Sequence, residues 1–235
     1  YKMIRKIISV IVCTICFLYT VYVLRDLTHF LSNHRNEETL IVAGKQQKVL
    51  LLYIFMIQHT VMASTSIKNI FCKLSIEHMT RTVYNMSSAA VLHLLLSHWQ
   101  LISWIKLWEV DTLSNSTSWF TFTAFHVLAW FIIYSGCLMM DISELTGLKQ
   151  VYYKLSGRPN PMEMKSLQLL RYYSHMRHPS FIGFLIILWI HPFMTLDRLL
   201  LASILSLYMV LMWKIDEEDY NYHVCIVRRK QRELY

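Results

Sequence analysis

The sequence predicts an all-α, polytopic helical membrane protein with about six transmembrane helices, and its composition and one long apolar segment support this prediction. Of the 235 residues, 55% are hydrophobic, and the mean hydropathy of +0.36 is too high for a soluble domain of this length. Segment 7–24 contains 18 residues without a charge, close to the roughly 20 that cross about 30 Å of hydrocarbon. Because lipid offers no partners to backbone amides, such segments must form helices.

Six apolar segments predict the individual helices. We interpret the first as a retained anchor, because cations precede it but no small-residue cleavage site of a signal peptide follows it. The whole chain, 1–235, is expected to form one integral membrane domain. In it, 1–140 holds four spans and 141–235 holds a hairpin region and a basic tail. The segments lie at about 7–24, 49–64, 82–104, 118–140, 180–192 and 197–213.

The last two segments predict a short helical hairpin. Residues 181–190 cover only about half of the hydrocarbon at about 1.5 Å per residue, and Pro192 stops the helix that they form. We therefore expect the first arm to begin near Ser166 and to be kinked at Pro179. Asp197 is expected at the start of the second arm, where a carboxylate is favourable to the helix dipole.

Lysine and arginine residues are distributed unevenly between the connections, which predicts the orientation of the spans. They are frequent before the first span, between the second and third, between the fourth and fifth, and in the tail, whereas 106–118 has one lysine and two acids. By the positive-inside rule, both termini face the cytosol or nucleoplasm, and 106–118 faces the lumen. Its Asn115-Ser116-Thr117 sequon is permitted on that side. Four cations between 25 and 48 run against this pattern.

The net charge of +8 has three explanations, which are membrane topology, attraction to anionic lipid, and attraction to nucleic acid. The chain has no nucleic-acid motif, so we favour topology. The expected partner is the lipid bilayer, and no specific nucleic-acid binding is expected.

Cysteine and histidine residues inside the predicted spans raise the question of a redox or metal site. Cys13 and Cys16 lie three residues apart in one span, which favours packing over a redox pair. His59, His93 and His126 lie in three different spans, where they could ligate haem or a metal or could hydrogen-bond neighbouring helices. They lack paired i,i+4 spacing, so the sequence favours hydrogen bonding and predicts no metal site.

The stretch 173–183, YSHMRHPSFIG, contains Arg-His-Pro between a tyrosine and a glycine, and the acids at 216–219 follow the hairpin. This pattern resembles the signature of the isoprenylcysteine carboxyl methyltransferase superfamily. The resemblance implies a pocket for S-adenosylmethionine on the cytosolic side and a lipophilic or prenylated substrate. The residues that it assigns to cofactor binding are Tyr173, Arg177, His178, Pro179, Gly183, Glu217 and Glu218; it assigns no catalytic residue.

The chemistry of these residues suits such a pocket. A carboxylate such as Glu217 or Glu218 can hold the ammonium group of the cofactor, and Arg177 can pair with its carboxylate through two hydrogen bonds. Each residue also has a structural explanation. Arg177 can extend to the lipid headgroups, and the two glutamates can pair with Lys214 on one helix.

Two further stretches, ELTGLKQVYY at 144–153 and LDRLLLA at 196–202, resemble the nurim family. The similarity runs from about 120 to 230 and includes the Arg-His-Pro segment. It implies a six-span protein of the inner nuclear membrane, tightly retained there, with a methyltransferase-like fold whose activity is not established. The partners implied are the nuclear lamina or other nuclear-envelope proteins, and the alternative location is the endoplasmic reticulum membrane.

Two hypotheses about function follow. In the first, the chain is a non-enzymatic nuclear-envelope protein that keeps the methyltransferase fold, because Arg171 stands where the superfamily has a glycine. In the second, it is an active S-adenosylmethionine-dependent methyltransferase that modifies a thiol or carboxylate. A transporter is a weaker hypothesis, because the sequence has no internal repeat.

Overall fold

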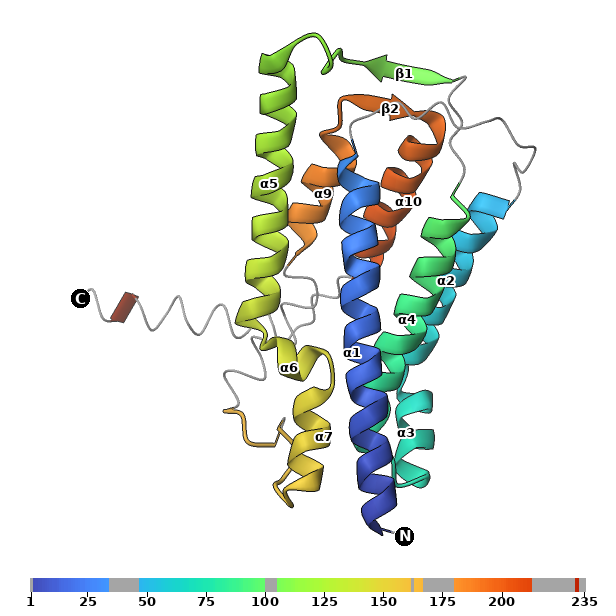
Figure 1. Ribbon diagram of the computed structural model, residues 1–235, viewed down its shortest axis with the longest axis vertical. Helices are drawn as coiled ribbons and strands as arrows, with labels where there is room; N and C mark the ends of the chain where they lie inside the picture. The colour runs from blue at the N-terminus through green and yellow to red at the C-terminus, as the bar shows by residue number, and fades with distance from the viewer. Residues whose placement is uncertain are drawn as a thin grey trace.

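Helices that run side by side along the long axis form the body of the protein (Figure 1). The computed structural model describes residues 2–33, 47–99, 105–161, 163–166, 180–212 and 231–232. Successive main helices alternate in direction (Figure 1). In space, α1 packs against α4, α4 against α2, α5 against α9, and α9 against α10. The main helices are α1 (Lys2–Ser32), α2 (Gln47–Ala63), α4 (Thr80–Ser97), α5 (Ser116–Met139), α9 (Phe181–Trp189) and α10 (Leu196–Met212).

Each of the six segments expected from the sequence overlaps one of these helices, and the hairpin of the last two is also present. Asp197 lies in the first turn of α10, as expected. The residues between Ser166 and Ser180, where a kink at Pro179 was expected, lie outside the described part of the chain.

Shorter elements gather at the end of the bundle where α1 begins (Figure 1). There α3 (Thr65–Lys73) continues α2 after a bend of 55°, and the single 3-10 turn η1 (Glu77–Met79) leads into α4. After α5 the chain forms α6 (Ile142–Leu145) and α7 (Leu148–Leu155). The helix α7 packs against η1 and α1.

Two short strands at the opposite end are a departure from the all-α prediction. The strands β1 (Lys106–Glu109) and β2 (Phe193–Thr195) pair in antiparallel fashion. The Val110 amide donates to Pro192 O at 2.8 Å and extends the pairing. The sequence does not predict these strands, because β1 is exposed along its whole length and therefore lacks the alternation of buried and exposed residues that identifies a half-buried strand.

The hydrophobic core joins all six of the main helices. Ala129 of α5, Ile187 of α9 and Ala202 of α10 are fully buried in it, and small side chains such as alanine allow helices in a membrane to approach closely. The buried core residues are Leu31, Leu52, Leu95, Ala129, Ile133, Ile187, Leu188, Leu201 and Ala202.

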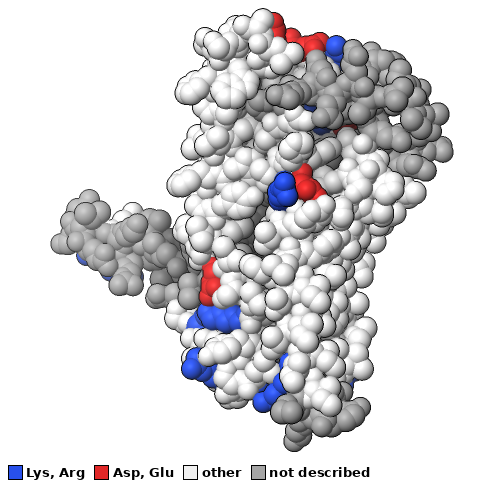
Figure 2. All heavy atoms as spheres, viewed as in Figure 1, with Lys and Arg blue, Asp and Glu red and all other residues white. Residues whose placement is uncertain are grey.

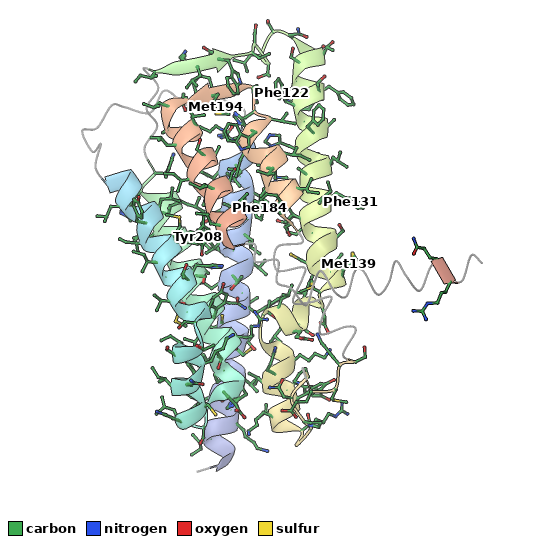
Figure 3. The ribbon with its side chains drawn as sticks, turned by 180° about the vertical axis from the view of Figure 1, so that it is seen from behind. Phe122, Phe131, Met139, Phe184, Met194 and Tyr208 are labelled. Carbon is green, nitrogen blue, oxygen red and sulfur yellow. The ribbon has the colours of Figure 1, made fainter. Side chains whose placement is uncertain are left out.

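The outer surface is strongly apolar. Among the described residues, two helices are long and apolar enough to cross a membrane, α1 from Lys6 to Ser32 and α5. A third is present if α2 and α3 form one bent span. On α5, Phe131 and Met139 point away from the bundle (Figure 3) and are 69% and 65% exposed. Large apolar side chains in such positions are typical of a lipid-facing surface.

The two long apolar helices are staggered along the axis. The hydroxyl groups of Thr28 and Tyr134 lie 3.0 Å apart, and Trp130 donates to Ser32 Oγ at 2.7 Å. The C-terminal end of α1 therefore lies beside the middle of α5. Closer to its N-terminus, α1 is accompanied by α7 instead, where Lys6 donates to Leu155 O at 3.3 Å.

Candidate functional site

The structure describes one of the seven residues that the sequence assigns to cofactor binding. Gly183 lies in the first turn of α9. The other six, Tyr173, Arg177, His178, Pro179, Glu217 and Glu218, lie outside the described residues.

The surroundings of Gly183 explain why this position is a glycine. A Cβ atom built there would lie 2.7 Å from Ala129 O and 2.7 Å from Ile133 Cγ1, both on α5. Next to it, Ser180 donates to Ile133 O at 3.4 Å. The first turn of α9 is therefore held against α5 at backbone contact distance. Helix packing accounts for Gly183 by itself, so this residue gives no support for a bound cofactor.

The stretch ELTGLKQVYY, which carries the resemblance to the nurim family, forms α6 and α7 directly after α5. Asp141 begins this region with a positive φ of 62° and caps α6, because its Oδ1 accepts from the Ser143 amide at 3.0 Å. Asparagine and aspartate are among the few residues that adopt this backbone conformation readily. The cap turns the chain sharply at the end of α5.

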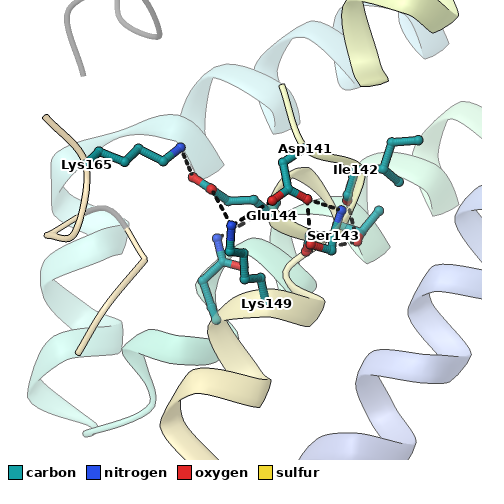
Figure 4. Close-up of polar contacts among 8 residues, drawn as sticks. Asp141, Ile142, Ser143, Glu144, Lys149 and Lys165 are labelled. Carbon is teal, nitrogen blue, oxygen red and sulfur yellow. Dashed lines mark hydrogen bonds and ion pairs between the residues drawn. The ribbon is translucent and has the colours of Figure 1, made fainter. Parts of the chain in front are cut away.

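Glu144 lies at the centre of a cluster of charged side chains (Figure 4). Its carboxylate is 4% exposed and pairs with Lys165, which is 9% exposed, over 2.7 Å between Oε1 and Nζ. Lys149 Nζ lies 3.8 Å from Glu144 Oε2 and 2.7 Å from Asp141 Oδ2. The buried charges are thus paired, as they must be away from water, and the pairs connect α6 to residues 163–166.

Gly147 brings α6 and α7 against α4. It adopts a left-handed conformation with φ of 89°, and a Cβ atom there would lie 2.7 Å from Thr82 Oγ1 and 2.9 Å from the Thr82 nitrogen. Both constraints exclude a larger side chain. On the other side of Thr82, Cys13 Sγ lies 3.5 Å from the hydroxyl and Cys16 Sγ donates to the carbonyl at 3.1 Å. Both thiols are free and buried, so the packing interpretation of these cysteines is confirmed.

The charged cluster shifts the titration of its more exposed members. The hydrogen bond from Lys149, followed by that from Ser143, lowers the pKa of Asp141 to about 2. In turn, the hydrogen bond to Asp141 raises the pKa of Lys149. A carboxylate with a lowered pKa stabilises the folded protein above its ordinary pKa, and this contribution is lost as the pH falls toward the lowered value.

The Asp141→Asn variant tests this linkage. Asparagine can still cap α6, so the variant removes the charge but keeps the cap. Because the pair is partly exposed to solvent, we expect a loss of no more than about 1 kcal/mol in the free energy of unfolding at pH 7. We also expect the acid-side loss of stability between about pH 4 and pH 2 to become shallower. Unfolding measured as a function of pH checks both, and an unchanged acid limb would contradict the assignment.

The three histidines of the predicted spans all contact neighbouring helices. His93 lies 2.9 Å from the Tyr19 hydroxyl of α1, and a ring nitrogen of His59 lies 2.9 Å from the Tyr84 hydroxyl of α4. His126 is buried. Of the two interpretations that the sequence allows, hydrogen bonding between helices is therefore the one observed. No group of three or more His, Cys, Asp or Glu side chains within the described ranges is arranged to hold a metal ion.

The hydrogen bonds of His126 fix its tautomer. Ile190 O can only accept, so His126 Nε2 carries the proton that is donated to it at 2.8 Å. In the neutral ring Nδ1 then accepts from Ser32, whose hydroxyl lies 3.0 Å away and itself accepts from Trp130. This chain of hydrogen bonds ties the end of α1 to α5 and to the turn after α9.

The LDRLLLA stretch joins α10 to the ends of two other helices. Asp197 is buried and accepts from Trp99 Nε1 at 3.1 Å, just beyond α4. Arg198 donates to Leu31 O at 2.7 Å, where a cation at a helix C-terminus is favourable. Both stretches that resemble the nurim family thus contain charged side chains that make specific contacts between helices.

The long-range ion pair is the part of the site that sequence analysis missed. Glu144 and Lys165 are 21 residues apart, and no rule of helical or strand spacing connects them. Chemically, the cluster holds two carboxylates and two ammonium groups as pairs. It therefore suits a structural connection better than nucleophilic or acid–base chemistry.

These features define the class of the protein, which is a helical membrane-type protein with an apolar exterior and with polar contacts at helix ends and between helices. No family model matches the chain, and no solved structure matches it. Curated relatives do match and identify the family.

The nurim homolog of Drosophila melanogaster is 34% identical over 247 aligned residues, which cover 98% of both chains. That of Drosophila pseudoobscura pseudoobscura is 43% identical over 180 residues, which cover 77% of this chain and 71% of the relative. Nurim of Danio rerio is 39% identical over 177 residues, which cover 74% of this chain and 64% of the relative. The chain belongs to the nurim family.

Proposed function

We propose that this chain is a multi-pass protein of the inner nuclear membrane with about six membrane segments, of which the last two form the short hairpin of α9 and α10, and that both termini face the nucleoplasm. The alternating direction of the helices supports this proposal, because each connection then lies on one defined side (Figure 1). In this proposal the protein keeps a methyltransferase-like fold without enzymatic activity, and it acts by holding a partner, such as the lamina or another envelope protein, at the membrane.

The distribution of cations is the observation that carries the orientation. Lysine and arginine side chains gather at the end of the bundle that holds α3 and α7 (Figure 2). The opposite end carries the exposed pair Lys106–Glu109 and Asp111. Positive residues remain on the cytosolic or nucleoplasmic side during insertion, so the α3–α7 end is assigned to that side.

Protease protection tests the orientation. In sealed membrane vesicles, a protease outside should cut near 155–165 and spare 106–118. Cleavage of 106–118 alone would reverse the assignment.

Selective permeabilisation tests the location. Digitonin opens the plasma membrane but leaves the nuclear envelope closed, so an epitope at the C-terminus of the full chain should stay hidden until a stronger detergent is added. A lamin epitope is the matched control for the nucleoplasm, and a cytosolic epitope of a resident reticulum protein is the control for exposure. Staining in digitonin alone would favour the endoplasmic reticulum membrane.

A second function is S-adenosylmethionine-dependent methylation of a lipophilic or prenylated thiol or carboxylate. The described residues on either side of the Arg-His-Pro segment favour this function, because both are held near the C-terminal end of α5. Lys165 pairs with Glu144, which follows α5, and Ser180 donates to Ile133 O of α5. In this function the cofactor supplies the methyl group, Glu217 and Glu218 hold its ammonium group, and Arg177 pairs with its carboxylate.

Calorimetry with S-adenosylmethionine on the detergent-purified chain separates the two functions. If the second is correct, we expect micromolar binding that is lost in His178→Ala and weakened in Glu218→Gln, while Glu109→Gln at the opposite end binds normally. A folded, monodisperse protein that does not bind the cofactor would leave the non-enzymatic function.

A further inference from the structure

A group of exposed cations surrounds the C-terminal end of α7. Lys6 of α1 lies against this end, because its ammonium group donates to Leu155 O. Lys154 and Arg158 are also exposed, and in the described part of the chain none of the three forms an ion pair with a carboxylate. This contrasts with the Glu144 cluster nearby, in which the lysines are paired with acids. The uncompensated positive charge therefore lies at α7's outer end.

Two tyrosines accompany these cations. The Arg158 guanidinium lies 5.8 Å from the ring centroid of Tyr152 and 5.6 Å from that of Tyr153, within the range of a cation–π contact. Tyr152 is 57% exposed. Tyrosine and arginine together are typical of the layer where hydrocarbon meets water, since tyrosine places its ring at the headgroup level and arginine binds phosphate through several hydrogen bonds.

The apolar surface of α1 indicates the depth of this group. Exposed large apolar side chains continue along α1 as far as Ile4, and the contact of Lys6 with Leu155 sets the end of α7 at the same level. The cations therefore lie where an apolar, lipid-like surface ends. A phospholipid matches both surfaces, because its acyl chains can contact the apolar side of α1 and its headgroup can contact the cations at the end of α7. A soluble partner would match the cations alone.

We propose that Lys6, Lys154 and Arg158 form a binding surface for the headgroups of anionic phospholipids in the leaflet on this side of the bilayer. The proposal rests on the membrane orientation given above. Further exposed cations at the same end, Lys68, Lys73 and Arg81, add to the positive charge of this side. The exposed acids Glu77 and Glu163 pair with none of the three cations among the described residues.

Spin-labelled lipids test the proposal on the full chain reconstituted in phosphatidylcholine bilayers. The measured quantity is the preference for phosphatidylserine over phosphatidylcholine among the motionally restricted lipids. We expect the unmodified protein to prefer phosphatidylserine. In the variant Lys6→Gln/Lys154→Gln/Arg158→Gln this preference should fall by a factor of about five or more. A fold-change of this size corresponds to about 1 kcal/mol, the contribution of one cation at an anionic surface.

Three controls make the result specific. Lys106→Gln removes an exposed cation at the opposite end and should leave the preference unchanged. Arg158→Lys keeps the charge, which carries most of the attraction to an anionic surface, and should keep most of the preference. Salt at about 0.5 M should reduce the preference of the unmodified protein, since it screens exposed charges.

Each failure has a distinct meaning. An unchanged preference in the triple variant, or an equal loss in Lys106→Gln, would overturn the assignment of this surface. Retention of a DNA duplex by the detergent-purified chain through the same three residues, without any lipid preference, would also overturn it in favour of nucleic acid. The absence of any restricted lipid would instead overturn the insertion in the bilayer on which the proposal rests.

Discussion

Replacing Glu144 by alanine is expected to lower the free energy of unfolding by about 3–5 kcal/mol, the usual cost of removing one partner from a buried ion pair. The reason is the surroundings of Lys165, whose side chain is 9% exposed and whose ammonium group would lose the Glu144 carboxylate at 2.7 Å. Lys149 cannot compensate, because it is itself a cation. Unfolding of the detergent-purified protein, followed by tryptophan fluorescence, measures the change.

The exposed pair Lys106–Glu109 provides the matched control. Its side chains are 47% and 39% exposed, so Glu109→Ala should cost no more than about 1 kcal/mol. Equal losses in Glu144→Ala and Glu109→Ala would contradict the buried environment assigned to Glu144.

A double variant separates lost charge pairing from lost packing. Buried ion pairs can often be replaced by apolar side chains of similar volume without loss of stability. We therefore expect Glu144→Leu/Lys165→Met to be more stable than either single variant. Additive losses from the two substitutions would show that the residues do not interact.

Replacing Gly183 by valine is expected to lower the free energy of unfolding by about 3 kcal/mol, at the upper end of what overpacking usually costs. The added Cβ would meet Ala129 O and Ile133 Cγ1, each at 2.7 Å, so α9 must move away from α5. The carbonyl oxygen belongs to the backbone of α5 and cannot rotate out of the way. Thermal unfolding in detergent checks the result.

The neighbouring Ile182 is the control for this prediction. It is 62% exposed on the same turn of α9, and Ile182→Val should change stability by less than about 0.5 kcal/mol, as is usual for exposed positions. Ile133→Ala removes the Cγ1 atom of the other contact, so in an Ile133→Ala background the stability lost in Gly183→Ala should be recovered only in part, because Ala129 O remains. Full recovery would show that the side chain of Ile133, and not the backbone of α5, sets the distance.

The positions of the helices could be predicted from the sequence because they depend on local apolar composition. Segment 118–140 matches α5 within two residues at its start, and the hairpin followed from the shortness of 181–190 and from Pro192. Gly183 was predicted as a cofactor residue, which stays a prediction, and the structure adds a packing contact with α5 that was not predicted. Such contacts depend on which helices become neighbours, and the sequence does not state this directly.

The contacts that were not predicted are those between distant residues. Lys165 reaches Glu144, and Phe193 of β2 pairs with Glu109 of β1, although neither separation corresponds to a period of regular structure. The three histidines show an intermediate case. Their placement in spans narrowed their role to two interpretations, and only the positions of Tyr19, Tyr84 and Ser32 distinguish between them.

The stagger between α1 and α5 has a consequence for how the molecule sits in lipid. The exposed apolar side chains run from Ile4 to Leu24 on α1 and from Trp119 to Met139 on α5, about 30 Å each at about 1.5 Å per residue. Because Thr28 lies beside Tyr134, these two apolar belts, one on each helix, overlap little along the long axis of the bundle. An upright molecule would leave part of one belt in water, and tilting is the usual response to such hydrophobic mismatch. The angle of the protein should therefore change with membrane thickness.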